Sequence, residues 1–225
     1  MDFHLPKLLR LPHPPVVGIL VSVTALGLFS LIASQIGADT GLSQFDRAVA
    51  ERLAAHRQET PWMRSAFWFI TQFGDVRWFF VFAFAGAVVL TLRHQVLFSI
   101  AWVLTLLVGG ILDGGLKDVF QRPRPTPPLR DEWIHTTTTS FPSGHSVGSE
   151  VAYVFLAYLL VLVLPQRWAR YAVAIGLGLL ILGIGFSRMY LGAHWSSDVA
   201  GGFLIGAAWV SLAITVVESI RRRRQ

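Results

Sequence analysis

The sequence KDVFQRPRPTPPLRDEWIHTTTTSFPSGH, residues 117–145, separates two long apolar runs and is unlike either of them. Its first part brings three cations into a short span: Lys117, Arg122 and Arg124. Prolines on both sides of Arg124 hold the chain extended, because the ring fixes φ and disfavours helix in the preceding residue. The stretch therefore predicts a basic loop that joins two helices.

The end of this stretch, Ser143-Gly144-His145, opens the next apolar run. Serine is a common N-cap, and the free backbone N–H groups of a first helical turn bind anions well. Cations, a helix start and a histidine close together predict a phosphate site with an acid or base built into it.

The composition indicates a membrane protein. Of 225 residues, 53% are apolar and only 14% are charged, whereas soluble domains carry roughly a quarter charged residues. The absence of cysteine excludes disulfides and thiolate metal sites. The net charge of +6 would suit nucleic acid, but four of the cations form the run 221–224. Such a run beside an apolar helix is typical of a cytoplasmic membrane boundary, so we expect no nucleic-acid partner.

Six apolar runs approach the length of about 20 residues that crosses a bilayer. We expect spans at residues 16–36, 76–92, 96–119, 146–164, 171–186 and 199–219. The first is longer than the apolar part of a cleaved signal peptide, so we expect it to be retained.

The remaining segments complete a single all-α domain over residues 1–225. Residues 1–15 are basic, apolar and rich in proline, which predicts an interfacial segment. Residues 37–75 are expected to form an amphipathic extracytoplasmic segment, because apolar side chains recur there at helical spacing between charged ones.

The charge distribution predicts an orientation in a bacterial inner membrane. An even number of spans places both termini on one side, and most cations near helix ends are on that side: Lys7, Arg10, Arg93, Arg167, Arg170 and the C-terminal run. Such cations favour the cytoplasm. The stretch 117–145 is then expected to face the periplasm or its equivalent.

A second polar segment, SRMYLGAHWSSD at residues 187–198, follows the fifth span and emerges on the same side. His194 and Asp198 are four residues apart, so they share a face if a helix begins near His194. The carboxylate can then accept a proton from one imidazole nitrogen and leave the other free to attack. With Arg188 and the first cluster, the pair predicts phosphoryl transfer through a histidine.

The chemistry of that reaction assigns tasks to residue types. Lys117, Arg124 and Arg188 would neutralise the non-bridging phosphate oxygens. The Ser143 side chain and the backbone at Gly144 would add hydrogen bonds. One histidine must attack while neutral and the other must donate a proton to the leaving oxygen. The residues alone leave open which histidine does which.

Three motifs carry a resemblance to a known family. They are K-x6-RP at residues 117–125, PSGH at 142–145 and SR-x5-H-x3-D at 187–198. In this order they resemble the signature motifs of the type 2 phosphatidic acid phosphatase (PAP2) superfamily. The match lies within residues 117–198, whereas residues 1–100 contribute only their hydropathy.

The resemblance implies a six-helix membrane enzyme that needs neither metal nor cofactor and acts on a lipid phosphate in the bilayer. It implies His194 as the nucleophile that forms a phosphohistidine, Asp198 as the residue that orients it, and His145 as the general acid. The implied phosphate ligands are Lys117, Arg124, Ser143, Gly144 and Arg188. Undecaprenyl diphosphate and phosphatidylglycerol phosphate are the expected substrates.

Three further residues are secondary candidates. Arg122 would touch the substrate or only hold the loop. Asp113 lies one turn before Lys117 and predicts an ion pair. Glu150 lies one turn beyond His145, and would tune that histidine, bind a head group or form a structural pair.

Two alternative functions remain open. A phosphotransferase would use the same phosphohistidine and pass the phosphoryl group to another lipid. A non-enzymatic protein would bind or transport anionic lipids, although binding alone does not require the pairing of His194 with Asp198. A soluble haloperoxidase would share the site chemistry but not the six apolar runs. The sequence leaves the oligomeric state open.

Overall fold

The computed structural model describes residues 14–37 and 40–223, and within them the chain is helical without any strand. The helices are α1 (Pro14–Ala33), α2 (Gly41–Glu59), α3 (Pro61–Gln72), α4 (Val76–Leu92), α5 (Val96–Phe120), α6 (Gly144–Val163), α7 (Arg167–Tyr190) and α8 (Ser196–Arg223). The predicted all-α class is confirmed. The expected interfacial segment lies outside the described residues, except for the two that begin α1.

Six stretches of helix are long and apolar enough to cross a membrane, as predicted. One boundary was wrong. The second candidate span is Pro61–Leu92, which combines α3 and α4 and begins well before residue 76. The most apolar part of this span has a mean hydropathy of 1.7. The two helices are separated by a turn at residues 73–75, where Asp75 caps α4 by accepting the Arg77 N–H at 2.9 Å.

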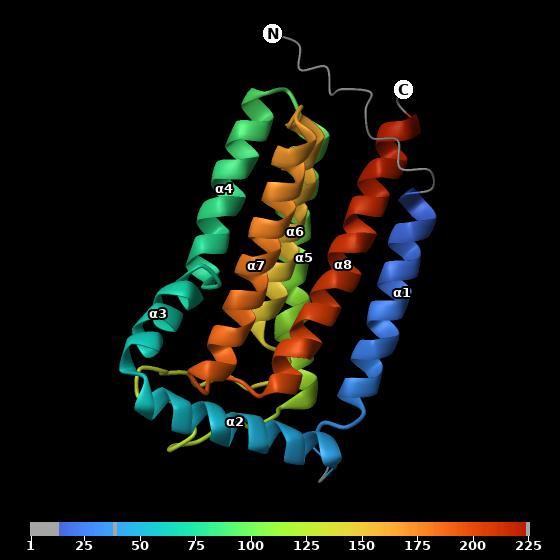
Figure 1. Cartoon of the computed structure of the whole chain (residues 1–225). Helices are drawn as coiled ribbons and strands as arrows, with labels where there is room; N and C mark the ends of the chain where they lie inside the picture. Colours follow the sequence, from blue (N-terminus) through green and yellow to red (C-terminus); the bar gives the residue numbers. More distant parts are fainter. Residues whose placement is uncertain (1–13, 38–39, 224–225) are drawn as a thin grey trace.

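The long helices run side by side, and α2 crosses one end of the bundle (Figure 1). The start of α1 and the end of α8 lie at the opposite end, while α3 leads from α2 up to α4. The predicted amphipathic helix is therefore present as α2. Its buried positions include two charged residues, Asp46 and Arg57, which periodicity alone would not place inside.

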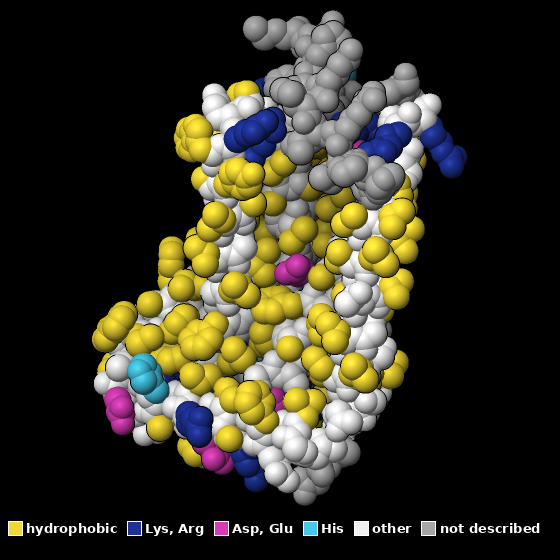
Figure 2. Space-filling view, turned by 45° about the vertical axis from the view of Figure 1, so that its right-hand side comes forward, with side chains coloured by type: hydrophobic (Ala, Val, Ile, Leu, Met, Phe, Trp, Pro, Cys, Tyr) yellow, Lys and Arg dark blue, Asp and Glu magenta, His cyan; other side chains and the backbone are white. Residues whose placement is uncertain are grey.

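The flank of the bundle is suited to lipid. Figure 2 shows hydrophobic side chains over most of the flank and charged side chains mainly near the two ends. Large apolar side chains are highly exposed there, for example Phe84 and Val119 at 74%. A soluble surface rarely carries so large an apolar area. The chain is thus a multi-pass membrane protein.

Small residues bring α8 close to α6. A Cβ on Gly206 would lie 2.8 Å from the Cβ of Glu150 and 3.2 Å from the carbonyl oxygen of Val147. Glycine at such positions lets helix backbones approach closely in a membrane. Nearer the α2 end, Phe141 is fully buried and packs in one cluster with Val147. This packing fixes the chain just before α6 begins.

The close approach of α6 and α8 gives a test of the packing. Gly206→Val should lower the free energy of unfolding by about 1–3 kcal/mol, because overpacking forces neighbours apart. Thermal unfolding in detergent measures the effect. Gly178→Val in α7 is the matched control, since nothing lies within 4 Å of a Cβ there. Equal losses in the two variants would contradict the close contact.

Candidate active site

The first turn of α6 begins at a serine whose hydroxyl group makes no hydrogen bond to the described residues. Ser143 is the N-cap of α6, yet its side chain makes no capping hydrogen bond, and its Oγ is buried without a partner. Its backbone N–H donates to the carbonyl oxygen of Asp198 at 3.0 Å, which ties the start of α6 to that of α8. A buried hydroxyl without a partner in the described residues is unusual and requires an explanation.

The next residue, Gly144, leaves room for a cation. A Cβ at this position would lie 2.7 Å from Oδ2 of Asp113 and 3.3 Å from Nζ of Lys117. The expected ion pair between Asp113 and Lys117 is present on α5. The ammonium group of Lys117 therefore lies directly against the first turn of α6.

The contact between Arg124 and His194 defines the tautomer of the histidine. Nη1 of Arg124 lies 2.9 Å from Nε2 of His194. A guanidinium only donates hydrogen bonds, so Nε2 must carry the lone pair and Nδ1 the proton. Nδ1 faces Oδ2 of Asp198 at 3.5 Å, which is a long contact. The imidazole thus presents an unprotonated Nε2 beside a cation.

The environment of His194 favours this neutral form. Burial, followed by the positive charges of Arg124 and Arg188, lowers the pKa of His194 well below its usual value of 6.5. Its side chain is 2% exposed. At neutral pH the imidazole therefore keeps the lone pair that a nucleophile needs.

Asp198 is fixed by three donors. Oδ2 accepts the Trp195 N–H at 2.8 Å and the Ser140 hydroxyl, and Oδ1 accepts from Arg122 at 2.6 Å. Because α8 begins at Ser196, His194 precedes the helix and does not share a helical face with Asp198. The two side chains meet across the first turn instead.

The turn between α3 and α4, to which the sequence analysis assigned no role, closes one side of the site. Nη1 of Arg188 donates to Thr71 at 2.8 Å, whereas its Nε is buried and has no partner among the residues that the structure describes. His145 packs on Gly74, where a Cβ would lie 2.9 Å from its Cδ2. Asp75 interacts electrostatically with both His145 and Arg188. The α3–α4 turn is therefore one wall of the site.

The three secondary candidates are placed differently. Asp113 lies in the site beside Lys117. Arg122 is buried behind Asp198, where it also binds Asp46. The Cβ and Cγ atoms of Glu150 pack against Gly206 of α8, at the contact between α6 and α8.

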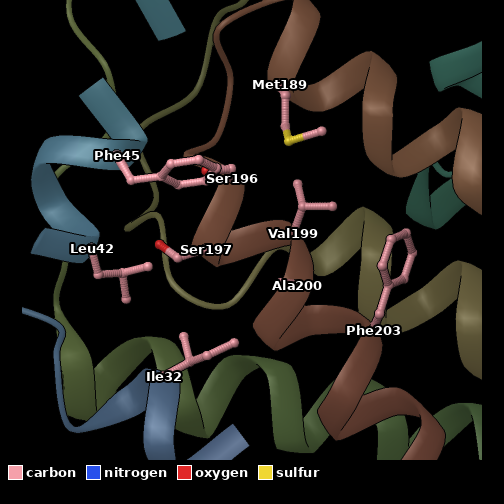
Figure 3. A pocket seen from close by; sticks show the side chains of 9 residues that line it. All are labelled: Ile32, Leu42, Phe45, Met189, Ser196, Ser197, Val199, Ala200 and Phe203. Carbon is pink, nitrogen blue, oxygen red and sulfur yellow. The ribbon is translucent and has the colours of Figure 1, made fainter. Parts of the chain in front are cut away.

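An apolar pocket of about 330 Å³ lies beyond the start of α8 (Figure 3). It is lined by the ends of α1 and α7 and by the first turns of α2 and α8. Of the described residues that line it, only Ser196 and Ser197 are polar. None of the described residues that line it belongs to the motifs' cations or histidines.

The site as a whole can hold a tetrahedral oxyanion next to a nucleophile. The unpartnered Oγ of Ser143 and Nε of Arg188, the ammonium of Lys117 and the first turn of α6 all offer donors. The guanidinium of Arg124 lies at the attacking nitrogen. Among the described residues, no group of three or more His, Asp and Glu side chains could hold a metal ion. The fold and the site define a helical membrane protein whose site is suited to a phosphoryl group.

Comparison with known proteins agrees with this class. Residues 98–222 match the family model of the PAP2 superfamily, and the chain belongs to that superfamily. It is 32% identical over 212 residues to phosphatidylglycerophosphatase B of Bacillus subtilis, covering 89% of this chain and 97% of the relative. It is also 26% identical over 136 residues to an undecaprenyl-diphosphatase of Sulfolobus acidocaldarius, covering 59% and 61% of the two chains.

A solved structure gives the same result. The crystal structure of a transmembrane PAP2-type phosphatidylglycerolphosphate phosphatase from Bacillus subtilis superposes with a TM-score of 0.78 and 27% identity. The match covers 91% of this chain and 97% of that one. The protein is a PAP2 membrane lipid phosphatase similar to phosphatidylglycerophosphatase B.

The low pKa of His194 predicts a pH dependence of stability. The unfolded chain binds the proton first as the pH falls, because its histidine pKa lies above that of the folded state. Stability should therefore be complete above about pH 6.5 and should fall below it. Thermal unfolding between pH 8 and pH 5 should show a weaker decline for His194→Asn. His135→Asn, at an exposed loop position, should decline as the native chain does.

The position of Arg188 predicts a loss of catalysis. Arg188→Gln should reduce kcat/KM for phosphate release by about 10²–10³-fold, the effect of removing one preorganised donor for an oxyanion. Arg167→Gln, an exposed residue at the other end of the same helix, is the matched control. Similar losses in both variants would show that Arg188 does not act on the phosphoryl group.

Proposed function

We propose that the protein hydrolyses the terminal phosphate of a lipid phosphate through a phosphohistidine, with phosphatidylglycerol phosphate as the first substrate to test. The observation that carries this proposal is the unprotonated Nε2 of His194, which lies 2.9 Å from Arg124 within the phosphate site. The named activity of the relative that spans nearly the whole chain supports the substrate. Undecaprenyl diphosphate is the second substrate, supported by the shorter match to an undecaprenyl-diphosphatase.

In the first step Nε2 of His194 attacks phosphorus, the N–P bond forms and the bond from phosphorus to the lipid oxygen breaks. His145, in its protonated form, gives its proton to that oxygen and becomes neutral. Lys117, Arg124 and Arg188, with Ser143 and the N–H groups at Gly144, hold the non-bridging oxygens. Arg124 exchanges its contact with Nε2 for one with phosphate.

In the second step a water molecule attacks the phosphohistidine. His145, now neutral, takes a proton from that water, the N–P bond breaks, and inorganic phosphate leaves. The proton on Nδ1 of His194 remains opposite Asp198 throughout, so the carboxylate stabilises the positive charge that the imidazole acquires. A lipid acceptor in place of water would give the phosphotransferase reaction.

We further propose that the protein lies in a bacterial inner membrane with its termini in the cytoplasm and its site on the outer side. The helix ends opposite the site carry Arg93, Arg167, Arg170 and the basic end of α8. Cations close to helix ends favour the cytoplasmic face. The lipid head group would then meet the site at the outer boundary, with its chains in the bilayer.

Phosphate release in detergent tests the proposal. The native chain should cleave phosphatidylglycerol phosphate in the presence of EDTA, and His194→Ala should reduce kcat by about four orders of magnitude or more, because the nucleophile is gone. Undecaprenyl diphosphate, phosphatidate and an acceptor lipid should be run in parallel.

The control is His94→Ala, a residue in the α4–α5 turn at the other end of the bundle. A His194→Ala variant as active as the native chain would exclude the phosphohistidine. Transfer to the acceptor lipid without release of phosphate would favour the phosphotransferase.

A further inference from the structure

Arg122 bridges two carboxylates behind the catalytic pair. Its Nη1 lies 2.6 Å from Oδ1 of Asp198, and its Nη2 lies 2.7 Å from Oδ2 of Asp46 on α2. The side chains of the two aspartates are 0% and 1% exposed, and that of Arg122 is 10% exposed. Three charged side chains are thus buried together, and one of them, Asp198, faces His194.

Asp46 has every oxygen engaged. Oδ1 accepts from the hydroxyl of Ser196 at 2.5 Å and from the N–H of Ser197 at 2.9 Å. Oδ2 accepts from the hydroxyl of Ser197 at 2.5 Å as well as from Arg122. The surface helix α2 is therefore bonded to the first turn of α8, the turn that also carries Asp198.

A buried network of this kind contributes little to the stability of the fold. Buried ion pairs often contribute no more than apolar residues of the same volume, because desolvation opposes the attraction between the charges. The neighbouring pocket is apolar (Figure 3). Its two serines are already bonded to Asp46. No polar group of the described pocket lining would replace a lost partner. The network is thus better explained by what it does to Asp198.

We propose that Arg122 and Asp46 are positioning residues for the nucleophile, which act through Asp198 and do not touch the substrate. This inference rests on the proposed phosphohistidine mechanism and extends it to two residues that are not among the fixed positions of the motifs. Arg122 occupies Oδ1 of Asp198, so the carboxylate cannot rotate and Oδ2 stays opposite Nδ1 of His194.

Asp46 determines the net charge of the cluster that it forms with Arg122 and Asp198. Two carboxylates and one guanidinium leave one net negative charge, so Asp198 still acts as an anion toward His194. Without Asp46 the guanidinium would cancel the charge of Asp198. The imidazole would then be less well stabilised when it becomes a cationic phosphohistidine.

The two residues therefore have opposite electrical effects on the same pair. Removing Arg122 takes away a positive charge, so His194 loses its proton at higher pH. Removing Asp46 takes away a negative charge, so His194 loses its proton at lower pH. The other charged or titratable groups that face the pair from the packed elements are Lys117, Arg124, His145 and Arg188, and all four are unchanged in both variants.

The experiment compares Arg122→Gln and Asp46→Asn with the native chain in detergent. Each variant should lose about 10- to 100-fold in kcat, the scale of a small misplacement of a reacting group, while KM stays close to native. The acid limb of the pH profile should move up for Arg122→Gln and down for Asp46→Asn. Arg122→Lys should restore part of kcat and should return the acid limb towards its native position.

The controls are Arg47→Gln and Glu51→Gln, which change the same charges at exposed positions of α2. Both should leave kcat and the pH profile as in the native chain. Native kcat in the Arg122→Gln and Asp46→Asn variants would overturn the proposal. Acid limbs that do not move, or that move in the same direction, would overturn it too, because lost packing alone gives no opposite shifts.

A measurement without substrate separates this inference from the proposed function. Nitrogen-15 NMR of histidine-labelled protein, with His194 assigned through His194→Asn, should show the Nδ1-protonated tautomer in the native chain. It should show a mixture of tautomers in Arg122→Gln. If the native chain releases no phosphate, the proposed function fails, yet the tautomer still decides the role of Arg122. An unchanged tautomer in Arg122→Gln would refute that role.

Discussion

The site depends on keeping one buried imidazole neutral among cations. Burial lowers the pKa of His194 most, and the positive charges of Arg124 and Arg188 lower it further. In the proposed reaction the same cations would attract the phosphoryl group, so one set of charges would both bind the substrate and keep the nucleophile unprotonated. Asp198 faces Nδ1 of the ring at 3.5 Å and would oppose these cations locally. Weaker cations would bind phosphate poorly, while a site without Asp198 would leave the developing imidazolium unsupported.

The membrane helices bring these groups together at one end of the bundle. The end of α5 supplies Lys117, the start of α6 supplies Ser143 and Gly144, the end of α7 supplies Arg188, and the start of α8 supplies Asp198. Each group lies within a turn or two of a helix end, where backbone donors and acceptors are free. Close contacts through small residues, such as Gly206, set the distances between the helices. The packing of the apolar helices thus determines where the polar site lies, although the apolar side chains are not part of the site.

Much of this arrangement could be predicted from the sequence, because hydropathy marks the spans and the motifs have fixed spacings. The ion pair of Asp113 with Lys117 follows from a single helical turn. The roles of Arg122 and Asp46 could not be predicted, since Arg122 is 76 residues from each of its two carboxylates. The periodicity of α2 placed Asp46 among the polar positions of a surface helix.

The anchoring of α2 bears on which part of the chain is needed for the reaction. The family match begins at residue 98, and all three motifs lie within it. Asp46, Thr71 and Asp75, which support Arg122, Arg188 and the surroundings of His145, all precede it. A chain trimmed to the matched region would carry every signature residue, but its arginines and aspartates would face water or lipid where they now face partners. The region that matches the family model is thus incomplete as a site, and residues that precede it supply the missing partners.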